Sequence, residues 1–326
     1  MLIDKYDRTH NYLRISLTDN CNLRCFYCMP EEDYHFMPNQ QLMQADELLQ
    51  IAREFVKQGV TKIRLTGGEP LVRKDAGEII SELGKLGVEL TITTNATRVQ
   101  HFVDVFEEAG ICSVNISLDT LQKEKFQLIT RRDQFDTVKQ NIDTLLSRGF
   151  KVKINVVVVK GLNDSEILDF IEWTKHIAIQ IRFIEFMPFD GNKWNRDKLV
   201  TLHEILATIN QKYSFIAAEN AAHDTSKNYS IPGHAGSFAI ISTMSVPFCN
   251  TCNRIRLTAD GKIKNCLFSE EETDLLKALR NGEALLPLIE SSLKAKHKEL
   301  GGQFTKQFDL IDANSIHNRS MIAIGG

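Results

Sequence analysis

The chain has 326 residues, of which 43% are hydrophobic and 25% are charged, as in a soluble globular protein that can bury a barrel-sized core and a smaller appendage. The formal net charge of −3 excludes the overall basic character of a nucleic-acid-binding protein. No apolar run approaches the ~20 residues of a membrane span. Because Asp4, Asp7 and Arg8 also rule out a signal-peptide core, we expect a cytoplasmic protein with no membrane partner.

Short runs rich in β-branched residues alternate with amphipathic helical runs from the start of the chain to about Phe186. This alternation predicts β/α units around a parallel sheet. Six units fall short of a closed eightfold barrel, so a splayed partial barrel and an open doubly wound sheet both remain possible. The six predicted strands span residues 12–17, 61–65, 88–93, 113–118, 152–158 and 179–184.

Polar motifs stand at the carboxyl ends of these predicted strands. A cysteine-rich loop at 21–28 follows the first strand, and the turn Gly67-Gly68-Glu69-Pro70 follows the second. The motifs at later strands are Thr93-Thr94-Asn95, Ser117-Leu118-Asp119 and Met187-Pro188. Because the loops at the carboxyl ends of parallel strands converge over one face, these motifs predict an active site there.

The cysteine loop places Cys21, Cys25 and Cys28 at C-x3-C-x2-C spacing, with Tyr27 before the third cysteine. Three thiolates in one loop can hold a cubane iron-sulfur cluster and leave one iron without a protein ligand. Zinc is the alternative, but zinc loops usually combine a short Cys spacing with a second pair, which is not found nearby. The loop therefore favours a cluster with one iron open to chemistry.

A second triad, Cys249, Cys252 and Cys266, has C-x2-C-x13-C spacing. The turn signal Asp260-Gly261 predicts a hairpin that brings the third cysteine back beside the first two. Structural zinc is a stronger alternative here, because zinc ribbons use the same device. The seventh cysteine, Cys112, is expected to be a buried small hydrophobe.

Strand periodicity places basic residues on common faces, Lys62 with Arg64, and Lys153 with Asn155. Tyr12 and Arg14 also share a face, and Arg182 lies on the sixth strand. Cations inside a barrel are costly unless an anion is bound there, so the set predicts a lumen for a phosphate-bearing ligand. The alternative is that these side chains point outward into solvent.

The chain ends in Gly325-Gly326. A frayed tail is one interpretation of this ending. The other is that two residues without side chains thread a carboxylate end into a crowded cationic site. Arg254 and Arg256, which share one face of the strand after the second triad, could form part of such a site.

The loop Cys-Asn-Leu-Arg-Cys-Phe-Tyr-Cys at 21–28 resembles the signature of radical S-adenosylmethionine enzymes. With Leu-Thr-Gly-Gly-Glu-Pro at 65–70, the second triad, Arg-Ile-Arg at 254–256 and the Gly-Gly ending, nearly the whole chain resembles the molybdenum cofactor biosynthesis protein A family of GTP 3′,8-cyclases. We expect an α/β fold, a partial (β/α)6 TIM-like barrel over residues 1–215. A smaller C-terminal α+β region at 216–326 should carry the second Fe-S cluster.

The resemblance implies a lyase with two 4Fe-4S clusters and S-adenosyl-L-methionine as cofactors. A 5′-deoxyadenosyl radical would abstract the ribose 3′ hydrogen of GTP and lead to (8S)-3′,8-cyclo-7,8-dihydroguanosine 5′-triphosphate, the first step of molybdenum cofactor biosynthesis. It also implies a homodimer, an external electron donor and a functional link to cyclic pyranopterin monophosphate synthase.

The resemblance also assigns roles to individual residues. All six cysteines of the triads would be cluster ligands, and Cys21, Cys25 and Cys28 would count as catalytic together with Arg14, Arg254, Arg256, Gly325 and Gly326. The S-adenosylmethionine site would comprise Tyr27, Gly68, Glu69, Ser117 and Met187. The GTP site would comprise Arg14, Lys62, Arg64, Thr93, Lys153, Arg182, Arg254, Ile255 and Arg256.

Two points in this resemblance concern the backbone. The glycine turn at 67–68 would let the chain approach the methionine moiety closely. The family commonly has glycine where this chain has Ala96, and a positive φ there would strain an alanine. Two rival functions also remain: another radical enzyme with an auxiliary cluster, acting on a peptide, and a non-catalytic metal module in which both triads only staple loops or pass electrons.

Overall fold

The computed structural model describes residues 1–29, 34–219, 221, 223–304, 311 and 316–325. The six predicted strands are present, each within one or two residues of the expected bounds. They lie side by side and parallel in chain order. The strands are β1 (Tyr12–Ser16), β2 (Lys62–Thr66), β3 (Glu89–Thr94), β4 (Ser113–Ser117), β5 (Lys151–Val158) and β6 (Gln180–Glu185).

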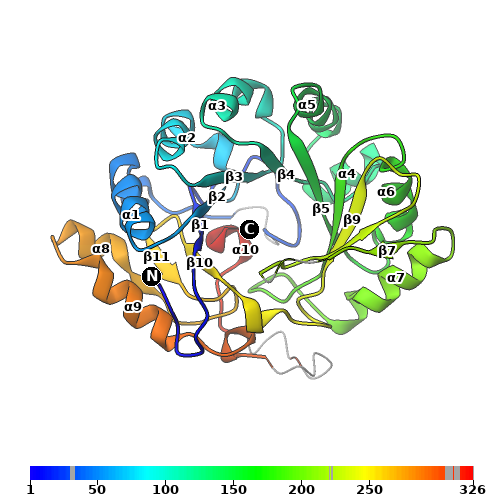
Figure 1. Cartoon of the computed structure of the whole chain (residues 1–326). Helices are drawn as coiled ribbons and strands as arrows, with labels where there is room; N and C mark the ends of the chain where they lie inside the picture. The colour runs from blue at the N-terminus through cyan, green and yellow to red at the C-terminus, as the bar shows by residue number, and fades with distance from the viewer. Residues whose placement is uncertain (30–33, 220, 222, 305–310, 312–315, 326) are drawn as a thin grey trace.

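Helices cover the outer face of this curved sheet (Figure 1). Alternate strand residues such as Leu13, Ile15 and Ile63 are fully buried against them and form the main hydrophobic core. None of the helices in the described residues has the length and apolar character needed to cross a membrane. The helices are α1 (Ala45–Lys57), α2 (Ala76–Gly84), α3 (Val103–Glu108), α4 (Lys123–Thr130), α5 (Phe135–Ser147), α6 (Ile167–Trp173) and α7 (Leu202–Asn210).

The C-terminal part extends both edges of the same sheet. On one side, β9 (Ser237–Ile241) pairs with β6 and continues into β8 (Lys227–Ser230) and β7 (Ile216–Ala217). On the other side, β10 pairs in parallel with β1 and continues into β11 and β12, giving a 12-stranded sheet. The bounds are β10 (Arg254–Leu257), β11 (Lys262–Lys264) and β12 (Thr273–Asp274).

The expected partial barrel is therefore confirmed, but the expected C-terminal region shares its sheet with the barrel. The boundary at 215/216 falls between α7 and β7 and stays a prediction. The remaining helices are α8 (Leu275–Arg280), α9 (Leu285–Ala295) and α10 (Met321–Ile324). Short 3-10 turns lie at Asn39–Gln41, Pro70–Val72, Val99–His101, Asp164–Glu166, Arg196–Lys198, Cys249–Thr251 and Leu300–Gly302.

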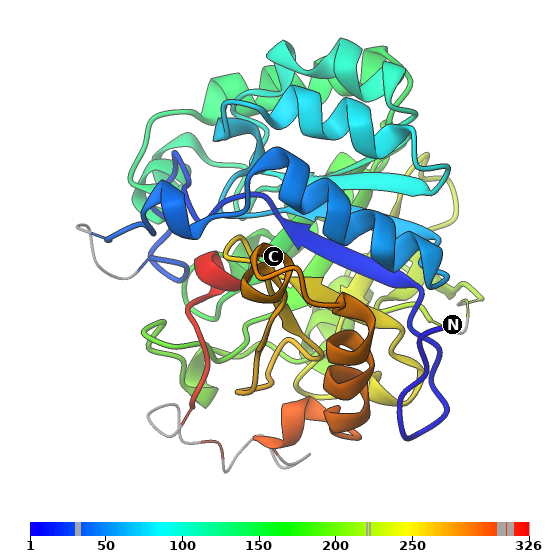
Figure 2. The ribbon, with the colours of Figure 1, turned by 90° about the vertical axis from the view of Figure 1, so that its left-hand side faces the viewer.

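The last helix, α10, lies inside the ring of strands in Figure 1. Figure 2 shows it at the end of the sheet toward which β1 runs, close to the cysteine loop. Ile322, Ala323 and Ile324 are buried there. The chain terminus therefore closes on the face where the sequence predicts the active site.

Candidate active site

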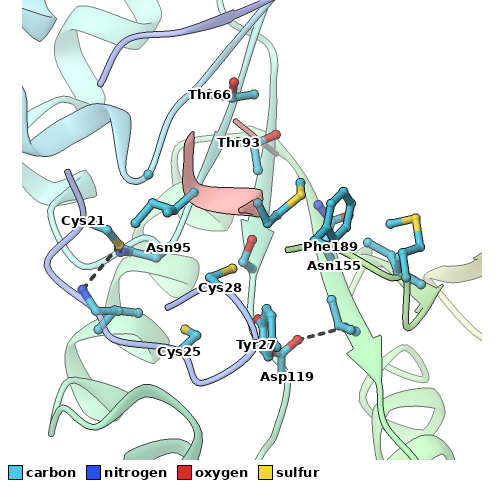
Figure 3. A pocket seen from close by; sticks show the side chains of 18 of the residues that line it. Cys21, Cys25, Tyr27, Cys28, Thr66, Thr93, Asn95, Asp119, Asn155 and Phe189 are labelled. Atoms are coloured by element: carbon cyan, nitrogen blue, oxygen red, sulfur yellow. Dashed lines mark hydrogen bonds between the residues drawn. The ribbon is translucent and has the colours of Figure 1, made fainter. Parts of the chain in front are cut away.

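A cavity opens at the carboxyl ends of the parallel strands, and every polar motif singled out in the sequence contributes to it (Figure 3). Helices α4 and α10 supply further lining residues. The predicted site residues that line this cavity are Arg14, Cys21, Cys25, Tyr27, Cys28, Arg64, Gly68, Glu69, Thr93, Ser117, Arg182, Met187 and Arg256. The structure thus brings most of the predicted site together.

The N-terminal triad lies in a turn that the backbone holds in shape. The amides of Cys28 and Met29 both donate to the carbonyl of Cys25, at 3.0 and 2.9 Å. Burial raises the pKa of all three thiols, to about 11 for Cys21 and well above the usual value for Cys25. The irons of a cluster would supply the positive charge that these buried sulfurs need as thiolates.

The spacing of the cysteines fits a cluster better than a single ion. Among the residues that the structure describes, no three His, Cys, Asp or Glu side chains gather closely enough to hold one metal ion. Zinc needs all its ligands on one ion, whereas a cubane binds each cysteine through a different iron and accepts more widely spaced sulfurs. This geometry disfavours the zinc alternative for both triads.

The glycine turn after β2 packs directly against the chain that leads into the cysteine loop. The amide of Gly68 donates to the carbonyl of Thr18 at 2.7 Å, and that of Glu69 donates to the carbonyl of Asn20 at 2.8 Å. A Cβ on Gly68 would lie 2.4 Å from the Asn20 carbonyl oxygen. Glycine is required here because two backbone segments touch, a reason that the sequence alone did not reveal.

Glu69 fastens this turn to the end of β3. Its Oε1 accepts hydrogen bonds from the Leu71 amide at 3.0 Å and the Thr94 hydroxyl at 2.7 Å, and its Oε2 accepts from the Asn95 amide at 2.6 Å. Burial raises the pKa of Glu69 to about 7 against these donors. Asn95 Nδ2 in turn lies 3.8 Å from the sulfur of Cys21. Glu69 thus supports the first triad through the backbone it holds.

Ala96 follows this network with a φ of 61°, in the left-handed region that favours glycine. The expected strain is therefore present. Asn141 Nδ2 donates to the Ala96 carbonyl at 2.7 Å, and the Ala96 amide donates to Thr94 Oγ1 at 3.1 Å. These bonds hold the strained backbone in place.

Tyr27 is fixed beside the triad by a buried carboxyl group. Its hydroxyl donates to Asp119 Oδ2 at 2.5 Å, and Asp119 Oδ1 accepts from the Val157 amide at 2.8 Å. Burial raises the pKa of Asp119 to about 6. The ring of Tyr27 therefore has a defined orientation at the cavity wall, next to Cys25 and Cys28 (Figure 3).

Cys249, Cys252 and Cys266 line a second cavity. The hairpin of β10 and β11 turns at Asp260-Gly261, as predicted, and returns the chain to Cys266. Arg256, Thr243 and Leu267 line both this cavity and the first one, so the two triads face a shared space.

The second triad lies in a cationic environment. Lys296 Nζ lies 3.7 Å from the sulfur of Cys252, and Arg254 Nη2 lies 3.5 Å from it. Burial alone would raise the pKa of Cys252, but Arg254 and then Lys296 outweigh it and lower this pKa to about 6. The Leu300 amide donates to the sulfur of Cys249 at 3.5 Å.

Four arginines from separate strands line the first cavity: Arg14, Arg64, Arg182 and Arg256. Burial lowers the pKa of Arg14 to about 10 and that of Arg182 to about 9. Within the described residues, the buried Nε atoms of Arg14 and Arg182 find no hydrogen-bond partner. Buried guanidinium groups with unused donors fit a bound polyphosphate, as the predicted lumen requires.

The other predicted GTP residues lie around this space without lining the first cavity. Lys62 pairs with Glu89 at 2.7 Å and is 31% exposed. Burial lowers the pKa of Lys153, with a further contribution from Arg182, which indicates that Lys153 lies near the arginines. Arg254 lines the second cavity, while the side chain of Ile255 is buried in the hydrophobic core.

The C-terminal tail enters the site, so the frayed-tail interpretation is wrong. The Gly325 carbonyl accepts a hydrogen bond from Arg256 Nη1 at 2.5 Å. Gly325 has a φ of 83°, and a Cβ there would lie 2.8 Å from Thr66 Oγ1. Glycine is therefore needed at this position for both conformation and space. Gly326 lies outside the described residues.

Sequence analysis missed Phe189 and Asn192, which line the cavity from the loop after β6. Phe189 stacks on Phe268 with ring centroids 5.8 Å apart, within a hydrophobic cluster that also contains Ile324. The only sequence signal was their position after a strand. The expectation for Cys112 was wrong, because this residue precedes β4 at the outer amino end and is exposed.

Comparisons with known proteins agree with this geometry. The model of the Radical SAM superfamily matches residues 15–174, and that of Molybdenum Cofactor Synthesis C matches residues 179–301. The GTP 3′,8-cyclase, mitochondrial, of Arabidopsis thaliana is 46% identical over 333 residues, which cover 100% of this chain and 84% of that protein. The GTP 3′,8-cyclase of Listeria monocytogenes is 39% identical, with coverage of 100% and 99%.

The chain belongs to the GTP 3′,8-cyclase family of radical S-adenosylmethionine enzymes. Some members are longer, since this chain spans 51% of the human molybdenum cofactor biosynthesis protein 1, to which it is 43% identical over 99% of its own length. The structure of Streptococcus suis SuiB bound to S-adenosylmethionine matches with a TM-score of 0.60 at 18% identity, covering 83% of this chain and 65% of SuiB. That likeness shows a shared fold, and the family membership favours the cyclase over its rivals.

Proposed function

We propose that this chain is a GTP 3′,8-cyclase that converts GTP to (8S)-3′,8-cyclo-7,8-dihydroguanosine 5′-triphosphate, the first step of molybdenum cofactor biosynthesis. The observation that carries the proposal is the shared space between two cysteine triads, lined by buried arginines with unused donors. An enzyme that joins the ribose and the base of one nucleotide must hold a radical source and the base at fixed positions. Two cluster sites with a phosphate-binding lumen between them meet that need.

The residues divide into two cofactor sites. Cys21, Cys25 and Cys28 would hold one 4Fe-4S cluster, and Cys249, Cys252 and Cys266 would hold the other. The first cluster, when bound together with S-adenosylmethionine, supplies the 5′-deoxyadenosyl radical that removes the ribose 3′ hydrogen. Tyr27, Gly68, Ser117 and Met187 would cradle the S-adenosylmethionine, and Glu69 would support them by holding the glycine turn.

The arginines of the lumen would bind the triphosphate. Charge-assisted hydrogen bonds from Arg14, Arg64 and Arg182 suit phosphate oxygens, with Lys62, Lys153 and Thr93 as additional contacts. Arg254 and Arg256 would hold the nucleotide beside the second cluster, whose open iron would face the guanine. Because Arg256 also binds the Gly325 carbonyl, the tail would help to fix this arginine during turnover.

The wall formed by Phe186, Phe189, Phe268 and Ile324 would keep water away from the reacting atoms. The product would then pass to a cyclic pyranopterin monophosphate synthase. A homodimer and an external electron donor belong to the proposal on family grounds only. The cytoplasmic location stays a prediction, since the Arabidopsis relative is named as mitochondrial.

The test is anaerobic reconstitution with iron and sulfide, followed by a measurement of S-adenosylmethionine cleavage with and without GTP. We expect cleavage that depends strictly on GTP and yields the cyclised nucleotide. Cleavage that ignores GTP would support another radical enzyme. No cleavage in fully reconstituted, reduced protein would support the non-catalytic module.

A further inference from the structure

The N-terminal segment reaches the second triad from the other end of the chain. Residues 2–10 form a small hairpin, in which Ile3 and Thr9 make an antiparallel bridge and the His10 amide donates to the Leu2 carbonyl at 2.8 Å. Asp4 lies inside this hairpin with a fully buried side chain. Neither the sequence motifs nor the proposed chemistry gives this segment a role.

Arg8 extends from the hairpin and binds two segments that are distant in sequence. Its Nη1 donates to the Cys249 carbonyl and to the Lys298 carbonyl, both at 2.7 Å, and its Nη2 donates to the His297 carbonyl at 3.1 Å. The side chain is 7% exposed. One buried guanidinium group therefore fixes the distance between the turn of Cys249 and the segment at 297–298.

Both of these segments contact sulfurs of the second triad. One segment contains the ligand Cys249 itself. The other is flanked by Lys296, whose Nζ lies 3.7 Å from the sulfur of Cys252, and by Leu300, whose amide donates to the sulfur of Cys249 at 3.5 Å. A shift of either segment would move hydrogen bonds that reach the cluster sulfurs.

The hairpin also holds Arg8 in one orientation. Asp4 Oδ2 accepts from Arg8 Nε at 2.7 Å and lies 2.9 Å from His10 Nε2, while Asp4 Oδ1 accepts from the Arg8 amide at 3.1 Å. Burying a lone guanidinium group would be costly, so the carboxylate is needed for the arrangement to be stable. The fork of Arg8 is therefore built in place before any cluster binds.

We propose that Arg8 is a positioning residue for the second cluster, acting through the Cys249 turn and the 296–300 segment. Groups behind the ligands commonly alter metal retention by about 10-fold or more, because they orient the ligands and set the charge around the sulfurs. Lysine cannot replace Arg8, since an ammonium group lacks the rigid fork that reaches three carbonyls. The proposal rests on the proposed function only for the presence of a cluster at the second triad.

The test uses the full-length chain reconstituted anaerobically, in two backgrounds that isolate each cluster. Replacing Cys21, Cys25 and Cys28 by Ser leaves the second cluster, and replacing Cys249, Cys252 and Cys266 by Ser leaves the first. In each background, Arg8→Lys is compared with Arg148→Lys, a change at an exposed ion pair with Glu107. The readouts are the rate of iron release to a chelator and the electron paramagnetic resonance spectrum of the reduced cluster.

We expect Arg8→Lys to speed iron release from the second cluster by about 10-fold or more and to change its spectrum, with the first cluster unaffected. Arg148→Lys should change neither. Equal acceleration at both clusters would overturn the proposal in favour of general destabilisation, and so would an unchanged second cluster. If Arg8→Lys does not fold, Asp4→Asn should show the same selectivity with a smaller effect. Because no readout is GTP turnover, absence of cyclase activity would leave this result interpretable.

Discussion

The two cysteine triads have the same number of ligands but opposite electrostatic surroundings. Around the first, burial and then nearby negative groups, Glu69 and Asp119 among them, raise the pKa of the thiols. Around the second, Arg254 and Lys296 outweigh burial and lower the pKa of Cys252 to about 6. The comparison teaches that the second site presents a thiolate before metal arrives, whereas the first depends on the charge of the incoming irons.

The largest expected effect comes from removing one ligand from each triad in turn. Cys25→Ser should abolish formation of 5′-deoxyadenosine, because the open iron that binds S-adenosylmethionine is lost with the cluster. Cys252→Ser should instead abolish cyclisation of GTP and spare the first cluster. Chromatography of the reaction mixtures measures both products. Detectable 5′-deoxyadenosine from Cys25→Ser would contradict the division of roles.

The tail lies between the two sites and should matter nearly as much. Deletion of residues 325–326 should reduce turnover to background and leave both clusters in place, because Arg256 loses its carbonyl partner. Gly325→Val should act similarly, since its side chain would meet Thr66 and Ser16. Iron analysis alongside the activity assay tests this expectation. Normal turnover in either variant would remove the tail from the mechanism.

The cations beside the second triad should affect GTP more than S-adenosylmethionine. Arg254→Ala combined with Arg256→Ala should weaken GTP binding by about 100-fold, since each charge-assisted hydrogen bond contributes about 1.5–3 kcal/mol. Calorimetric titration under anaerobic conditions gives both affinities. Arg280→Ala, at an exposed pair with Glu47, is the matched control. Unchanged GTP affinity in the double variant would mean that the nucleotide lies elsewhere.

A pH effect should arise on the side of the second triad. Burial, followed by Lys296 and opposed by Asp4, lowers the pKa of His10 from 6.5 to about 4. Because the unfolded chain then takes up a proton that the folded protein refuses, stability should fall as pH decreases from about 6.5 to about 4. The loss is up to about 3 kcal/mol. Urea unfolding of cluster-free protein should show this slope, and His10→Gln should flatten it; an unchanged slope would contradict the assignment.

The smallest effect is expected near the first triad. Ala96→Gly relieves a left-handed alanine but removes a buried methyl group, so the free energy of unfolding should rise by about 0.5–1 kcal/mol. The midpoint of urea unfolding measures it. Ala109→Gly, in the right-handed C-terminal position of α3, is the control and should destabilise. A decrease in stability for Ala96→Gly would show that the φ of 61° carries no strain.

Local patterns predicted much of the fold, because strand alternation and glycine stops act over a few residues. The strands up to Gln180–Glu185 and the hairpin at Asp260-Gly261 followed from such patterns. The parallel pairing of Arg254–Leu257 with Tyr12–Ser16 could not, since it joins segments far apart in sequence. Without that pairing, the shared space between the triads was also out of reach.

For the site, residue type and strand position were enough to identify the cysteines and the arginines of the lumen. The reason for Gly68 was not, because it depends on contact with the carbonyl of Asn20 in another loop. Cys112 shows the reverse error, since an apolar residue type at a strand start does not determine which side of the sheet it faces. Contacts between distant segments account for these failures.

The most direct test of the central claim is Mössbauer spectroscopy of anaerobically reconstituted protein with iron-57, supported by iron and sulfide analysis. Two cubanes with open corners predict about eight irons per chain. Addition of S-adenosylmethionine should change the signal of one iron in the first cluster, and addition of GTP should change one iron in the second. Zinc in either triad, or a spectrum that neither ligand alters, would contradict the account.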